Sequence, residues 1–207
     1  MDIWQGVEQQ RRDIADHLSG LTDDQWDGPS LCEEWRIRDV LGHITAGATG
    51  AYGFRTVVPG LARHGFNFSR WMAADGKQRG RQDPAVILST LRENAGSHAK
   101  PPGAPPMSVL CDVMIHGQDM CRPLGITREL PEEELRAVGD FARTAFVFDA
   151  KKRTAGLCLR ATDMDWTAGD GPEVSGPGEA LLMAMAGRRA ALADLGGEGQ
   201  PILAARF

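Results

Sequence analysis

Apolar residues recur at helical spacing along four stretches of the chain, and this pattern predicts a mainly α-helical protein. The four stretches are residues 2–19, 36–54, 85–98 and 107–122. In the second of them Ile37, Val40 and Ile44 fall on one stripe within about 100° of arc, as expected of a helix with one buried face.

Proline and glycine divide the remainder of the helical region. Pro59 and the glycine after it predict the end of one element, and residues 67–74 predict a short helix. The polar run 76–83 contains two glycines and predicts a loop. A further helix is expected over residues 132–148, because its acidic first turn suits a helix N-terminus.

The pattern changes near residue 154, where apolar and polar residues begin to alternate. Short strands are predicted around residues 156–162, 164–167 and 173–174, followed by a helix over 179–186 and a last strand over 201–207. Alternation with a period of two is typical of a half-buried strand. The chain is therefore divided into a helical bundle, residues 1–150, and a small α/β C-terminal region of two to four strands plus a helix, residues 151–207, packed on the bundle.

Composition and charge narrow the classes of function. The net charge of −5 excludes a typical nucleic-acid binder, which carries a basic stripe. No apolar run is long enough to span a membrane, and the N-terminus has no apolar signal core. The four cysteines form no CxxC pair, which favours free thiols in a reducing cytoplasm.

Three polar residues in the fourth helix are the first candidates for chemistry. Asp112, His116 and Asp119 lie at positions i, i+4 and i+7, so a helix places them on one face. Apolar residues such as Val113 and Ile115 flank this polar stripe on both sides. Polar groups between apolar neighbours are costly to bury unless they are paired. A carboxylate and an imidazole one turn apart suit a shared divalent metal, which is the hypothesis that this spacing raises.

His43 lies at the edge of the apolar stripe of the second helix, where its side chain is able to reach a cleft between helices. Asp39, one turn earlier, is predicted to orient the imidazole from behind. The alternative is that His43 is a half-exposed histidine with no function. The spacing alone does not decide between a site residue and such a histidine.

Three segments together resemble the mycothiol-dependent maleylpyruvate isomerase family. They are the block from Pro29 to Trp35 with the following run 38–43, the Asp112–His116–Asp119 helix with the run 122–125, and the tail from residue 161 to residue 188, which resembles short actinobacterial members. The resemblance covers most of the chain and implies a DinB-like four-helix bundle that binds a divalent metal, typically zinc.

Carried over position by position, the resemblance makes His43, Asp112 and His116 the metal ligands and assigns Asp119 to orienting His116 or Arg122. The family more usually has glutamate where this chain has Asp112. An aspartate reaches about 1.5 Å less, so the helices lie closer, a water bridges, or the metal is held weakly.

The function implied by the resemblance is a cytoplasmic metal-dependent isomerase or transferase that uses a low-molecular-weight thiol such as mycothiol on a small-molecule substrate. The alternative is a non-catalytic metal- or small-ligand-binding module, which the shorter aspartate and the short tail favour. Neither nucleic acid nor a membrane is an expected partner, and a homodimer is compatible with the sequence. A purely structural helical protein is a third and poorer reading.

Overall fold

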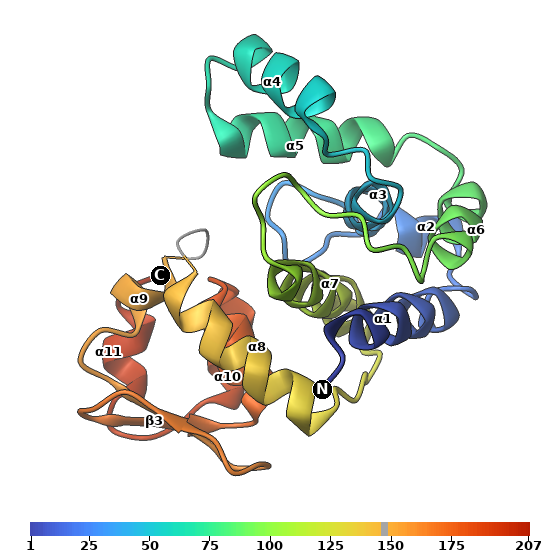
Figure 1. Ribbon diagram of the computed structural model, residues 1–207. Helices are drawn as coiled ribbons and strands as arrows, with labels where there is room; N and C mark the ends of the chain where they lie inside the picture. Colours follow the sequence, from blue (N-terminus) through green and yellow to red (C-terminus); the bar gives the residue numbers. More distant parts are fainter. Residues whose placement is uncertain (146–148) are drawn as a thin grey trace. The chain divides into compact units, whose positions relative to one another are not determined.

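The computed structural model describes residues 1–145 and 149–207 (Figure 1). Its contacts divide the chain into two compact units, Asp2–Arg128 and Glu129–Phe207 with Met1. The first unit is helical, and the second combines helices with a small sheet. The protein is thus mainly α-helical with a small α/β C-terminal part, as predicted. Among the described residues, none of the helices is long and apolar enough to cross a membrane.

Four helices of the first unit pack in a ring and form the predicted four-helix bundle. They are α1 (Ile3–His17), α3 (Ile37–Ala48), α6 (Pro84–Glu93) and α7 (Pro106–Cys121). Helix α7 packs on α1 and α3, and α6 packs on the same two helices from the other side. The apolar stripes face inward, with Ile14, Leu41, Leu91 and Met114 among the fully buried side chains. Each helix hides its apolar face against two neighbours.

A pair of helices, α4 (Phe54–Arg63) and α5 (Phe68–Arg79), connects α3 to α6. Two predictions about this segment were wrong. Pro59 lies inside α4 instead of ending an element, and the first half of the run predicted as a loop, residues 76–79, is the last turn of α5. The α3 helix also ends at Ala48, and α6 ends at Glu93, both several residues earlier than predicted.

Short helices complete the first unit. They are α2 (Asp23–Trp26) and the 3-10 turn η1 (Arg122–Leu124), which follows α7 directly. Gly125 ends that turn with a left-handed backbone, φ +68°, a conformation in which glycine is favoured because it has no Cβ.

The second unit is built on a three-stranded sheet of order β2-β1-β3. Its elements are α8 (Glu132–Thr144), α9 (Ala150–Arg153), β1 (Cys158–Ala161), β2 (Thr167–Ala168), β3 (Glu173–Gly176), α10 (Gly178–Met185), the 3-10 helix η3 (Arg189–Asp194) and α11 (Gln200–Ala204). Strand β1 pairs antiparallel with β2 and parallel with β3. The apolar α10 packs against α8, and both helices bury their facing residues.

The second unit differs from the sequence prediction in two respects. Residues 201–207 form no strand, because Gly196 already pairs with Ser175 at that edge of the sheet and the chain continues into α11. The unit also begins after Arg128, whereas the sequence placed the boundary after residue 150, since α8 packs on α10. Residues 146–148, the end of the helix predicted over 132–148, lie outside the described residues.

Candidate metal centre

Two facing helices of the bundle bring the three proposed ligands together. His43 comes from α3, whereas Asp112 and His116 come from α7, one turn apart. The Nε2 atoms of His43 and His116 each lie 3.5 Å from Oδ1 of Asp112. Ligand atoms of all three residues lie within 4.8 Å of one another. The two imidazoles and the carboxylate therefore converge on one point between α3 and α7.

Asp119 fixes the orientation of the His116 ring. Its Oδ2 lies 2.9 Å from Nδ1 of His116, and its side chain is fully buried. A carboxylate only accepts when it is ionised, so Nδ1 of His116 carries the proton and donates it. The lone pair of Nε2 is then free on the side that faces Asp112, as a metal ligand requires.

Tyr52 does the same for the His43 ring. Its hydroxyl lies 2.8 Å from Nδ1 of His43 and donates a 3.0 Å hydrogen bond to Oδ2 of Asp75. Burial, and next to it the charge of Asp75, raises the pKa of the Tyr52 phenol above its ordinary value, so the hydroxyl keeps its proton. The phenol oxygen accepts from Nδ1–H of His43, which leaves Nε2 of His43 free as well.

Asp112 is ionised in this arrangement. Burial by itself would raise the pKa of its carboxyl, but when the two imidazoles are protonated, the positive charges of His43, His116 and Arg11 outweigh burial and lower the pKa to about 2. Arg11 is completely buried on α1 and donates hydrogen bonds of 2.8–3.4 Å to three backbone carbonyls of residues 94–97. A buried guanidinium therefore faces the carboxylate through the bundle, and its own pKa falls to about 10 because of burial.

Trp35 covers the two imidazoles on their apolar side. Its ring centroid lies 5.1 Å from that of His43 and 5.8 Å from that of His116, and its Nε1 donates to the carbonyl of Ala73. The indole also packs against Gly76 of α5, where a Cβ atom would come within 2.4 Å of the ring. Gly76 is thus needed for the close approach of α5 to Trp35.

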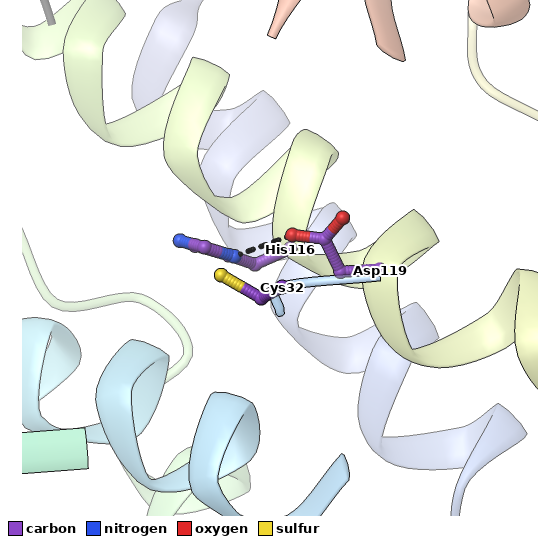
Figure 2. Close-up of side chains that lie close together, drawn as sticks. All are labelled: Cys32, His116 and Asp119. Carbon is purple, nitrogen blue, oxygen red and sulfur yellow. Dashed lines mark hydrogen bonds and ion pairs between the residues drawn. The ribbon is translucent and has the colours of Figure 1, made fainter. Parts of the chain in front are cut away.

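Cys32 forms a second group with the same histidine, in which ligand atoms of Cys32, His116 and Asp119 lie within 4.8 Å of one another. Figure 2 shows the Cys32 sulfur beside the imidazole of His116, whose Nδ1 bonds to Asp119. Because that nitrogen is already engaged, this second group offers a weaker donor set than the free Nε2 atoms on the other side of the ring.

The predicted role of Asp39 does not match its contacts. Asp39 accepts hydrogen bonds from the backbone N–H and the guanidinium of Arg36, at 2.9–3.1 Å, and so caps the first turn of α3. The partner of His43 is Tyr52 instead. Tyr52 and Asp75 carried no sequence signal, and Cys32 appeared only as part of the block from Pro29 to Trp35, because the place of these residues beside the histidines exists only in the folded chain.

The sequence and the fold were compared with those of known proteins. Residues 7–106 match the family model described as the mycothiol maleylpyruvate isomerase N-terminal domain. Two crystal structures of the mycothiol-dependent maleylpyruvate isomerase, one of them a histidine-to-alanine mutant, superpose with TM-scores of 0.67 and 0.66. Each has 13% sequence identity, with 96% of this chain and 92% of the other covered, so this likeness shows the fold alone. No curated protein matches the sequence.

Proposed function

We propose that this chain, whose residues 7–106 match the family model of the mycothiol maleylpyruvate isomerase N-terminal domain, is a metal-dependent enzyme acting with a low-molecular-weight thiol. In this proposal His43, Asp112 and His116 hold a divalent ion, most simply zinc. The thiol is mycothiol or a close analogue, and the protein works in the cytoplasm, where such thiols stay reduced. Its reaction is the isomerisation of, or transfer to, a small electrophilic substrate.

The observation that carries the proposal is the spacing of the three donor atoms. Zinc binds imidazole nitrogen and carboxylate oxygen at about 2.0–2.1 Å, so two ligands of a tetrahedral site lie about 3.3–3.4 Å apart. Oδ1 of Asp112 lies 3.5 Å from Nε2 of each histidine. These two distances match those between ligands of a tetrahedral zinc ion, and ligand atoms of all three residues lie within 4.8 Å of one another.

The surroundings of the donors support the same reading. Both histidines present a free Nε2 because Asp119 and Tyr52 engage their Nδ1 atoms. Three protein ligands leave one position open, and a metal bound there lowers the pKa of a coordinated thiol so that a thiolate exists at neutral pH. Trp35 keeps water from the imidazoles on its side and holds their orientation.

The first experiment is elemental analysis of protein purified without a metal-affinity tag. We expect close to one zinc per chain, and about none in His116→Ala. The control variant is His17→Ala, since His17 is the last residue of α1 and, in the part of the chain that the structure describes, its imidazole bonds only to Asp13. His17→Ala is expected to keep its zinc. A protein that carries no metal, and whose melting temperature does not respond to added zinc, overturns the proposal.

The second experiment tests the chemistry. Zinc-loaded protein is assayed with maleylpyruvate, the substrate named for the structurally similar enzyme, with and without mycothiol. The proposal expects turnover that requires the thiol and disappears in His116→Ala. Stoichiometric zinc without any thiol-dependent turnover of this or related electrophiles supports the alternative, a metal-binding module that has no catalytic activity.

A further inference from the structure

An open cavity lies on a different face of α3 from the metal centre, between α3, α5 and α6. Its volume is about 570 Å³, within the roughly 300–1,000 Å³ that is usual for small-molecule sites. The floor is formed by small or apolar residues, Gly42 and Ala46 of α3 and Ile87 of α6. The proposed metal chemistry uses none of these residues.

The polar residues of the cavity have unmet bonding capacity. Arg81 lines the cavity and is exposed, and within the described part of the chain its guanidinium makes no ion pair or side-chain hydrogen bond. Thr45 also lines the cavity, is 6% exposed, and its hydroxyl has no hydrogen-bond partner among the described residues. A buried hydroxyl without a partner costs free energy that a ligand is able to recover. Gln78 and Gln82 add amide groups beside Arg81.

The cavity is connected to the proposed metal centre by a chain of side-chain contacts. Asp75 and Arg79 belong to its lining, and Nε of Arg79 lies 2.6 Å from Oδ2 of Asp75. The same Oδ2 accepts from the hydroxyl of Tyr52, which in turn accepts from His43. The Arg79 guanidinium also lies over the Tyr52 ring, 5.3 Å from its centroid. A change at Arg79 is therefore felt at a proposed metal ligand.

We propose that this cavity binds a small organic carboxylate, and that its occupancy strengthens the hold of His43 on the metal. The ligand's carboxylate lies between Arg81 and Arg79, and its apolar body lies over Ala46 and Ile87. When the ligand attracts the Arg79 guanidinium, the ion pair between Arg79 and Asp75 weakens. The Asp75 carboxylate then accepts a stronger hydrogen bond from the Tyr52 hydroxyl. The binding site stands on its own observations, and only its effect on the metal rests on the proposed function.

The binding arm uses benzoate as the probe, its neutral isostere benzamide as the comparison, and calorimetric titration of the metal-free protein. Benzoate is expected to bind at least tenfold more tightly than benzamide. Arg81→Gln is expected to weaken benzoate about tenfold, and Thr45→Val about threefold, in line with a charge-assisted and a neutral hydrogen bond. The control is Arg55→Gln, an exposed arginine of α4 that does not line the cavity, with unchanged affinity expected.

Either of two results overturns the site. One is that benzamide binds as tightly as benzoate, and the other is that Arg81→Gln and Arg55→Gln lose the same affinity for benzoate. Inorganic phosphate that binds as tightly as benzoate overturns the role of the apolar floor, and with it the proposal of an organic ligand. Circular dichroism of each variant separates lost binding from lost folding.

The coupling arm compares benzoate affinity in zinc-loaded and zinc-free protein. Coupling free energies are reciprocal, so a zinc affinity raised about threefold by benzoate implies a benzoate affinity raised about threefold by zinc. Tyr52→Phe is expected to abolish this factor while zinc-free protein still binds benzoate. In metal-free protein, benzoate is also expected to shift the NMR signals of the His43 ring, but not in Tyr52→Phe. Unchanged His43 signals in wild type overturn the coupling, even if the protein proves to bind no zinc.

Discussion

The most direct test of how the centre is held is Asp119→Asn, which removes one charge and keeps the size of the side chain. The Asp119 carboxylate is completely buried and accepts the Nδ1–H of His116 at 2.9 Å. An asparagine oxygen is able to accept the same hydrogen bond. It does so without the negative charge that makes Nε2 of His116 a better electron donor to a metal.

The expected cost follows from the role of such outer partners in other metal sites. Loss of one of them usually weakens metal binding by about 10–100-fold. With free zinc at about 100 times the wild-type Kd, bound zinc stabilises the wild-type fold by about 2.7 kcal/mol. At the same zinc concentration the stabilisation of Asp119→Asn falls to about 1.4 kcal/mol for a tenfold loss and about 0.4 kcal/mol for a hundredfold loss.

Chelator competition measures the zinc Kd, and urea unfolding with and without zinc measures the stabilisation. The matched control is Asp140→Asn, since Asp140 of α8 also accepts a ring N–H, from Nε1 of Trp166 at 3.0 Å, but in the other unit. Its zinc affinity is expected to stay at the wild-type value. A Kd for Asp119→Asn within twofold of wild type, with the fold intact, would refute the claim that Asp119 tunes His116.

Two further predictions concern packing and thiol chemistry. Gly76→Ala places a methyl group 2.4 Å from the Trp35 ring and is expected to destabilise by about 1–3 kcal/mol, whereas Gly47→Ala in α3, with open space around it, is expected to stabilise by about 0.5–1 kcal/mol. The midpoints of urea unfolding measure both changes in stability, and equal shifts in the two variants would contradict the packing argument. Burial raises the pKa of Cys121 to about 11 and that of Cys111 further still, so both stay protonated thiols at about pH 8. Native protein is expected to show two thiols that react with Ellman's reagent and two that react only after unfolding. Four rapidly reacting thiols would contradict the burial.

The bundle was predictable because each of its helices hides a stripe of apolar residues, and a stripe is visible in the sequence. The same holds for Asp112 and His116, whose spacing of four residues fixes their common face before any tertiary contact forms. His43 required the family resemblance in addition, because an edge position is compatible with both a buried site and a solvent-facing histidine. The structure brings His43 to the pair, with its side chain 10% exposed.

The wrong prediction of a loop over residues 76–83 arose because glycine has two uses. The glycines of residues 76–83 suggested a loop, yet Gly76 is helical and makes room for Trp35, and Gly80 makes room for Asp39 at the end of the helix. Sequence alone does not separate a glycine needed for a turn from one needed for close packing. The role predicted for Asp39 does not match its contacts for a different reason. Its partner is Arg36, three residues earlier in the chain, and not His43.

The exposure of the three proposed ligands indicates where a thiol approaches. The side chains of His43 and His116 are 10% and 12% exposed, whereas that of Asp112 is 43% exposed. Trp35 closes the imidazole side, and Arg11 lies buried behind α7 on α1. An ion held by these three residues would be reached from solvent on the side of Asp112, so the carboxylate would lie next to an incoming thiol.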